Sequence, residues 1–290
     1  MKNLIVEYHN HMKTAYKNFP VQIRIENTIN CNASCTICPR EKLTRPQGTM
    51  SFENFCTILD QCDPDKLKDL HLQGFGEPLL DNDFVKKIIY ARKKLPNTRL
   101  FFVTNASLLK GDLAKEIILS GVDKIKISFY GITACDYENI HRPLKYAAIR
   151  KNILDFIKLK KTLKSSKPRV SVKYIGSISE FISFIFQWIG KANVEFSHFH
   201  NYGSGRKFKL QKKNKKPLCP MVSRPIMQIL WNGDVVPCCY DFNGDYIIGN
   251  VLESGLKNVW ESKKYQSLRK LNNEYKITSI PICSSCDKIK

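Results

Sequence analysis

The chain has 290 residues, a formal net charge of +21 at pH 7 and eleven cysteines. This length can bury a sizeable core and allows one large or two small domains. No run approaches about eighteen consecutive apolar residues, and the first residues lack a signal peptide's apolar stretch, so we expect neither a membrane span nor secretion. Cysteines without a secretory signal indicate metal binding in a reducing compartment, hence a cytoplasmic protein.

The positive charge favours anionic partners such as nucleotides or phosphorylated sugars. Much of it is diffuse and typical of a solvated, lysine-rich surface. The densest basic run, Arg206 to Lys216, contains Phe208 as its only aromatic residue, which argues against nucleic acid as a partner. We expect an interdomain linker here, over residues 206–218.

Apolar, β-branched runs alternate with longer amphipathic stretches after a short N-terminal extension over residues 1–20. The runs predict strands at 21–25, 70–73, 100–104, 124–129, 170–174 and 194–199. The stretches between them predict helices at 51–62, 82–95, 107–120, 146–164 and 178–190, the last of them buried because residues 181–189 are mostly apolar. Ser51 and either Asp81 or Asn82 are expected N-caps, and Gly121 is an expected helix stop. The alternation predicts a parallel sheet with right-handed crossovers and a site at the carboxyl ends of its strands.

Three cysteines, Cys31, Cys35 and Cys38, follow the first predicted strand within a single loop. A four-iron cluster needs four protein ligands, so a local set of three leaves one iron open to a small molecule. A zinc site lacking one ligand and three buried thiols are the alternatives. Zinc knuckles favour paired CxxC units, and burial gives no reason for clustering in an Asn/Ser-containing loop.

The spacing C-x3-C-x2-C directly after a strand resembles the signature of the radical S-adenosylmethionine (radical SAM) superfamily. The resemblance implies an α/β fold with a partial (β/α)6 barrel over residues 21–205. It also implies that a [4Fe–4S] cluster binds SAM and cleaves it reductively to a 5′-deoxyadenosyl radical, which abstracts hydrogen from the substrate. An external electron donor of the flavodoxin or ferredoxin type belongs to this chemistry.

A glycine-containing segment, Gly74-Phe75-Gly76-Glu77, follows the second predicted strand. It resembles the glycine–glycine–glutamate motif of the family, with Phe75 inserted between the glycines. The resemblance implies that Gly74, Gly76 and Glu77 contact the methionine amino group of SAM. An ordinary turn between strand and helix is the alternative.

Polar side chains also follow the next strands. Thr104 and Asn105 end the third predicted strand and Ser128 ends the fourth, where family members hold the ribose and carboxylate of SAM. Helix capping and a turn are the alternatives for these positions. The guanidinium of Arg142 has the planar fork that suits a carboxylate, although a surface arginine explains it equally well.

A second set of cysteines lies in the last quarter of the chain: Cys219, Cys238, Cys283 and Cys286. Between them, Asn232-Gly233 predicts a hairpin tip that joins 226–230 to 235–237, and a helix is expected over 254–271. The pattern resembles the shortened "twitch" form of the SPASM domain, a small α+β domain here placed at 219–290. The resemblance implies one auxiliary [4Fe–4S] cluster, and a structural zinc ribbon is the alternative.

The arrangement with one auxiliary cluster is similar to that of radical SAM dehydrogenases and epimerases of aminocyclitols and sugars. We expect oxidation of a carbinol in a small, anionic substrate, with the auxiliary cluster as electron acceptor. An epimerase in which Cys239 donates a hydrogen atom is one alternative, and inert packing of that cysteine is another.

Two further functions remain open from the sequence. Peptide modification is disfavoured because only about twenty residues precede the first strand, too few for a leader-binding domain. A non-catalytic iron–sulfur or zinc protein for electron transfer or nucleic-acid binding explains the cysteines and the charge. It leaves the segments at successive strand ends unexplained.

Overall fold

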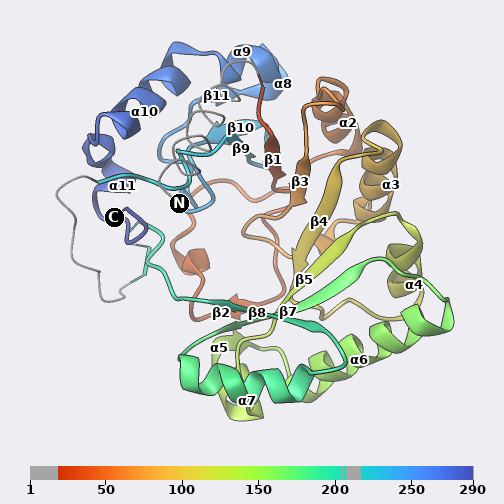
Figure 1. Cartoon of the computed structure of the whole chain (residues 1–290). Helices are drawn as coiled ribbons and strands as arrows, with labels where there is room; N and C mark the ends of the chain where they lie inside the picture. Colours follow the sequence, from red (N-terminus) through yellow and green to blue (C-terminus); the bar gives the residue numbers. More distant parts are fainter. Residues whose placement is uncertain (1–18, 204, 207–216, 290) are drawn as a thin grey trace, which may run out of the picture.

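Nine strands form a mostly parallel, curved sheet in the computed structural model, which describes residues 19–203, 205–206 and 217–289. The strand order is β11-β10-β9-β1-β3-β4-β5-β7-β8, and the helices cover its outer side (Figure 1). The expected extension over 1–20 and the expected linker over 206–218 fall largely outside the described residues.

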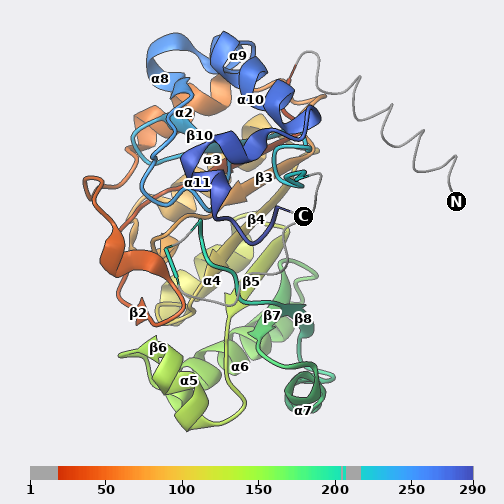
Figure 2. The same cartoon turned by 90° about the vertical axis from the view of Figure 1, so that its left-hand side faces the viewer.

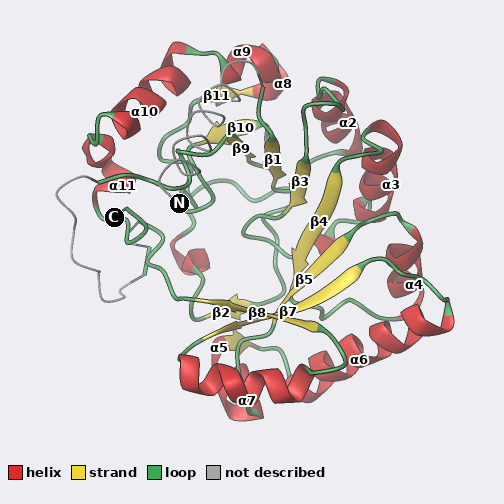
Figure 3. Ribbon diagram, viewed as in Figure 1, coloured by secondary structure: helices red, strands yellow, loops and turns green. Residues whose placement is uncertain are grey.

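The six predicted strands are all present within one or two residues of the expected bounds. They are β1 (Gln22–Ile25), β3 (Asp69–Leu72), β4 (Arg99–Thr104), β5 (Lys124–Ser128), β7 (Arg169–Ile175) and β8 (Asn193–Ser197). Each neighbouring pair in this series is parallel, which confirms the α/β partial barrel. The strands curve around a common interior, with the helices outside (Figure 3).

The five predicted helices of the barrel are also present. They are α2 (Phe52–Asp60), α3 (Phe84–Lys94), α4 (Gly111–Leu119), α6 (Tyr146–Thr162) and α7 (Ile178–Trp188). Ser51 caps α2 by accepting a hydrogen bond from the Asn54 N–H at 3.0 Å, and Gly121 follows α4 with φ +86°. The expected cap of α3 is wrong, since this helix begins after Asp83.

Several short elements were not predicted from the sequence. A capping box at Thr133 and Asp136 starts helix α5 (Ala134–Ile140). A separate two-stranded sheet joins β2 (Ser34–Cys35) to β6 (His141–Arg142). The remaining short turns are the 3-10 helices η1 (Pro39–Lys42), η2 (Pro78–Leu80) and η3 (Ile277–Ser279).

The C-terminal segment extends the sheet of the barrel. The predicted hairpin is present as the antiparallel strands β9 (Ile226–Ile229) and β10 (Asp234–Val236), and β10 also pairs with β11 (Gly249–Asn250). Unexpectedly, β9 lies parallel to β1, with Gln22 opposite Ile226. Strands from the two ends of the chain are therefore hydrogen-bonded neighbours.

The single helix expected over 254–271 is wrong. The structure has three helices in this region, α8 (Val251–Ser254), α9 (Leu256–Trp260) and α10 (Lys263–Asn273), followed by α11 (Pro281–Ser284). Gly255, with φ +80°, breaks the first helix, and Ser262 caps the third by accepting a hydrogen bond from the Tyr265 N–H. These helices and α5–α7 lie at opposite ends of the curved sheet (Figure 2).

Helix α7 differs from the buried helix that the sequence predicts. Phe184 and Trp188 are buried, but Ile178, Ile182 and Phe186 are 69%, 55% and 70% exposed. Their spacing of four places these three apolar side chains on one outward face. Within the described residues no helix is both long and apolar enough to cross a bilayer.

An ion pair is buried between α3 and the turn before it. Lys87 Nζ lies 2.6 Å from Asp81 Oδ2, and the two side chains are 0% and 4% exposed. The same ammonium donates to the carbonyl of Met50, which directly precedes the N-cap of α2. Asp81 also accepts from the Asp83 N–H at 3.1 Å, so its carboxylate fixes the turn instead of capping the helix.

We expect Lys87→Met to lower the free energy of unfolding by about 3–5 kcal/mol, because it leaves Asp81 as a buried, unpaired charge. The neighbouring Lys86→Met is the matched control, since Lys86 pairs with Asp83 at 3.1 Å on the exposed surface. Its effect should stay within about 1 kcal/mol. Urea denaturation followed by circular dichroism measures both, and equal losses would contradict the assignment.

Candidate active site

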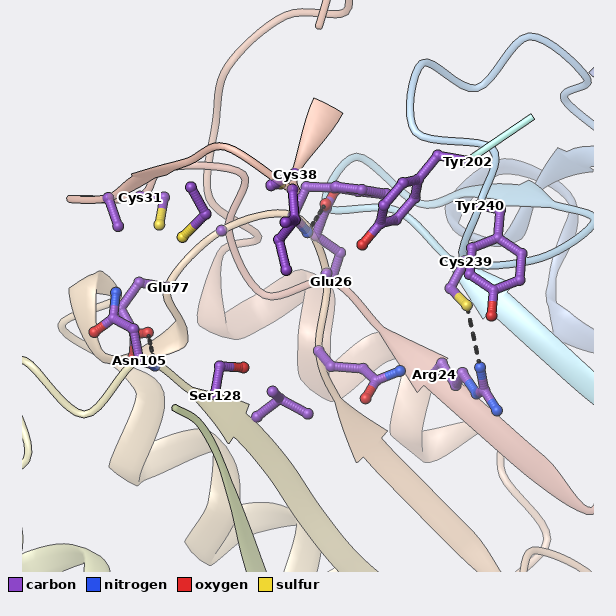
Figure 4. A pocket seen from close by; sticks show the side chains of 18 of the residues that line it. Arg24, Glu26, Cys31, Cys38, Glu77, Asn105, Ser128, Tyr202, Cys239 and Tyr240 are labelled. Carbon is purple, nitrogen blue, oxygen red and sulfur yellow. Dashed lines mark hydrogen bonds between the residues drawn. The ribbon is translucent and has the colours of Figure 1, made fainter. Parts of the chain in front are cut away.

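A cavity of about 370 Å³ opens at the carboxyl ends of the barrel strands. Its wall combines residues of the barrel with residues of the C-terminal segment (Figure 4). The predicted site residues in the wall are Cys31, Cys35, Cys38, Gly74, Gly76, Glu77, Thr104, Asn105, Ser128, Cys238 and Cys239. The fold thus brings the first cysteine set, Cys238 of the second set and the strand-end motifs to one space.

The first cysteine loop is fixed by contacts with neighbouring segments. Cys35 lies on β2, and its Sγ is 3.3 Å from Nδ1 of His141 on β6. The Arg40 guanidinium donates to the carbonyls of Ile29 at 2.5 Å and Phe75 at 2.9 Å. The loop is therefore tied both to the end of β1 and to the glycine segment after β3.

The environment of Cys31, Cys35 and Cys38 fits a shared cluster. Burial, together with the neighbouring Cys38 and Cys31 thiols, raises the pKa of Cys35 to about 12, and burial likewise raises the pKa of Cys38 to about 11. Bound iron displaces such protons, since a coordinating thiol is deprotonated outright. Within the described ranges no group of acidic, histidine or cysteine side chains converges on a single metal ion. A four-iron cluster binds its cysteines through different irons.

The second cysteine set also comes together, from three segments of the chain. Cys219 is held by Asn272, which accepts from its N–H at 2.7 Å. Burial raises the pKa of Cys238 well above its usual value and that of Cys283 to about 12, and neighbouring thiols of the set add to both shifts. Burial raises the pKa of Cys286 to about 11. The nearby Cys219 thiol adds to this shift, and a backbone hydrogen bond partly offsets it. Cys219 and Cys283 are buried, and Cys238 and Cys286 are partly exposed. Four cysteines gathered from separate segments are the donor set of a cysteine-ligated cluster.

The glycine segment requires glycine for steric reasons. A Cβ on Gly76 would lie 2.2 Å from the carbonyl oxygen of Thr28 and 2.6 Å from that of Asn30. A Cβ on Gly74 would lie 2.2 Å from Cγ of Glu26. The segment packs directly against the backbone that leads into Cys31, so both glycines shape the wall of the cavity.

The side chains after β3 and β4 bind one another. The buried Glu77 carboxylate accepts from the Thr104 hydroxyl at 2.6 Å, the Asn105 N–H at 2.7 Å and the Leu79 N–H at 3.2 Å. Burial raises the pKa of Glu77 to about 7, although these hydrogen bonds act in the opposite direction. The Asn105 amide donates to Asn32 at 2.9 Å, beside Cys31. These groups therefore position the cluster loop as well as facing the cavity.

Arg142 is not brought to the cavity. It is exposed on β6 and pairs through its backbone with Ser34, and it is absent from the described wall residues. Successive side chains of a strand point to opposite sides, and His141 takes the inward position. The expected contact between Arg142 and the carboxylate of SAM has no support in this geometry.

Two charged wall residues, Arg24 on β1 and Glu26 directly after this strand, were not predicted from the sequence. Arg24 donates to Cys239 Sγ at 3.4 Å, as Figure 4 shows. Glu26 is fully buried and receives a bidentate pair from Arg45 at 2.6 and 2.7 Å. The alternation along β1 could have predicted the position of Arg24. Ile23 and Ile25 are buried on one side of the strand, so Arg24 lies on the other side and faces the interior of the barrel.

Aromatic rings line the part of the cavity near the second cysteine set. The ring of His200 lies 3.9 Å from that of Tyr202 and 4.3 Å from that of Tyr240, measured between centroids. Phe75 of the glycine segment packs edge-on against Tyr202 at 5.9 Å. These rings form a packed aromatic wall of the cavity beside Cys238 and Cys239.

Comparison with known proteins agrees with this architecture. Residues 25–172 match the radical SAM superfamily, and residues 219–287 match SPASM, an iron–sulfur cluster-binding domain. The first match spans more than half of the chain, so the chain belongs to the radical SAM superfamily. The superfamily uses a [4Fe–4S] cluster and SAM, and the SPASM match supports an auxiliary iron–sulfur cluster over zinc.

Relatives align over nearly the whole length of the chain. The tungsten-containing aldehyde ferredoxin oxidoreductase cofactor-modifying protein of Pyrococcus furiosus is 23% identical, with 92% of this chain and 88% of the relative covered. The S-adenosyl-L-methionine-dependent 2-deoxy-scyllo-inosamine dehydrogenase of Niallia circulans is 20% identical, with 92% of each covered. A crystal structure of BtrN in complex with AdoMet and 2-DOIA is 19% identical and superposes with a TM-score of 0.66, covering 94% of this chain and 99% of that one.

We expect Gly76→Ala to weaken SAM binding about tenfold or more, because the new Cβ displaces the backbone before Cys31. Gly249→Ala is the control, since its Cβ would meet only the Val259 side chain, at 3.3 Å. Equilibrium dialysis with SAM and the iron content of each variant measure the effect. Unchanged SAM binding in Gly76→Ala would refute the steric account.

Proposed function

We propose that this radical SAM enzyme oxidises a carbinol carbon of a sugar, aminocyclitol or nucleotide-linked carbohydrate. The observation that carries the proposal is the single cavity whose wall contains Cys31, Cys35 and Cys38 together with Cys238 of the second set. A substrate held there would lie between both cluster sites. The relative from Niallia circulans is a dehydrogenase of a 2-deoxy-scyllo-inosamine, which supports an alcohol in a small ring as the substrate.

The residues of the chain divide the cavity into two parts. Cys31, Cys35 and Cys38 would hold the first cluster, with SAM beside Gly74–Glu77, while Cys219, Cys238, Cys283 and Cys286 would hold the auxiliary cluster. When bound, SAM and its cluster would provide the radical chemistry that removes a hydrogen atom from a C–H bond, and the auxiliary cluster would accept one electron. The backbone around Gly74 and Gly76 shapes the first part, and the rings of Tyr202 and Tyr240 line the second.

The cellular setting is part of the same proposal. All eleven cysteines lie in the described part of the chain and none is paired in a disulfide, which supports a reducing, cytoplasmic environment. Radical SAM enzymes need a reductant, and we assign this role to a flavodoxin or ferredoxin type of donor. Peptide modification is the second candidate, supported by the likeness of the fold to Streptococcus suis SuiB bound to the precursor peptide SuiA, at a TM-score of 0.72.

Anaerobic reconstitution of the full chain tests the cluster assignment. We expect about eight irons, corresponding to two four-iron clusters, and cleavage of SAM to 5′-deoxyadenosine. Cys35→Ala should lose about four irons and SAM cleavage, whereas Cys286→Ala should lose about four irons and keep SAM cleavage. Zinc in the C-terminal site together with no SAM cleavage would defeat the proposal.

Cys239→Ala separates oxidation from epimerisation. In the oxidation we propose, this variant continues to form a ketone from the alcohol that the wild type oxidises, since no thiol hydrogen is needed. Mass spectrometry of the product in deuterated water is the measurement. A wild-type product of unchanged oxidation state that carries solvent deuterium, and is lost in Cys239→Ala, would establish the epimerase instead.

A further inference from the structure

Two cationic side chains reach the cavity from different walls of the barrel. Arg24 lies on β1 and Lys173 on β7, and both line the cavity. Three strands, β3, β4 and β5, separate β1 from β7 in the sheet, so the two charges face the same space across the interior. Arg24 Nη1 donates to Cys239 Sγ at 3.4 Å, and its Nε and Nη2 donate to the Gln22 amide oxygen at 2.7 and 3.1 Å.

Neither cation has an ion-pair partner among the residues that the structure describes. Glu195, which lies opposite Lys173 in the sheet, instead pairs with Lys124 at 2.5 Å and Lys126 at 3.2 Å. Burial and the nearby Lys126 hold the pKa of Lys173 below its usual value, as expected for an ammonium with insufficient counter-charge.

The carboxylates in the cavity wall, those of Glu26, Glu77 and Asp241, are all engaged in ion pairs or hydrogen bonds within the protein. Glu26 is bound to Arg45, and Glu77 accepts three internal hydrogen bonds. Asp241 accepts from two backbone N–H groups, those of Asp245 at 2.8 Å and Tyr246 at 3.0 Å. Among its carboxylates and cations, the wall thus offers two cations and no free carboxylate to a bound molecule.

The cations also stand apart from the part of the cavity assigned to SAM. Figure 4 shows Arg24 beside Cys239 and Tyr240, across the cavity from Cys31, Glu77 and Asn105. An anion bound by Arg24 would therefore belong to the second molecule in the cavity.

We propose that Arg24 and Lys173 form a subsite for a phosphate group of the substrate. A phosphate monoester carries about −1.5 to −2 charges at pH 7, which matches two cations better than a carboxylate does. The arginine fork binds two oxygens in one plane, and the lysine supplies a point charge from another direction. The inference rests on the proposed function, because it assigns the substrate to the phosphorylated or nucleotide-linked carbohydrates.

Calorimetric titration of the reconstituted full chain with inorganic phosphate, in the presence of saturating SAM, tests the subsite. SAM occupies the other part of the cavity and so removes binding of phosphate at the open iron. We expect phosphate to bind, acetate not to bind, and Arg24→Gln and Lys173→Met each to weaken phosphate binding about tenfold or more. Iron content and SAM affinity should stay unchanged in both variants, which shows that they are folded.

Lys191→Met is the matched control, because Lys191 lines a separate basic hollow with Lys160, Lys161 and Arg169. It should leave phosphate affinity unchanged. Absence of phosphate binding, equal binding of acetate, or an equal loss in Lys191→Met would each overturn the subsite. If Arg24→Gln fails to fold, Lys173→Met and Arg24→Lys, which keeps the charge and loses the fork, still decide the question.

The two proposals fail in different ways. Cleavage of SAM by a chain that does not bind phosphate would refute the subsite and leave the oxidation standing. Phosphate binding that depends on Arg24 and Lys173, in a chain that does not cleave SAM, would refute the oxidation and keep the subsite.

Discussion

The buried carboxylate of Glu26 is the interaction on which the site depends. It binds the Arg45 guanidinium through both oxygens, accepts the Phe75 N–H at 3.0 Å and faces the Trp231 N–H at 3.4 Å. These partners belong to the segment after the first cysteines, the glycine segment and the hairpin of the C-terminal region. A charge without access to water must be fully paired, so one side chain obliges three distant segments to meet.

This constraint gives the strand-end motifs a structural meaning as well as a chemical one. Gly74 is small because Glu26 occupies the space beside it, and Gly76 is small because the carbonyls of Thr28 and Asn30 do. The carboxylate oxygens of Glu77 accept hydrogen bonds from Thr104, Asn105 and Leu79 within the protein. The motif therefore builds the wall against which a ligand lies, and its backbone is as important as its side chains.

The sequence predicted the elements well because their periodicity is strong, and it predicted the cysteine sets because their spacing is distinctive. The sequence did not predict which side chains form hydrogen bonds with one another in the site. The pairing of Glu77 with Thr104 and Asn105 depends on side-chain direction at three strand ends, and Arg142 faces outward because a two-residue strand turns His141 inward. The broken C-terminal helix shows that one glycine with positive φ overrides a helical pattern.

The pairing of β9 with β1 also fixes the order in which the molecule is completed. Ile23 lies opposite Met227, so the first strand gains its second neighbour only after most of the chain has been synthesised. Closing so long a loop is slow, and contacts of this kind form late in folding. The loop of Cys31, Cys35 and Cys38 continues directly from β1, and its surroundings are therefore incomplete until then. The surroundings of the first cysteine loop are therefore completed only when the C-terminal segment has docked on β1.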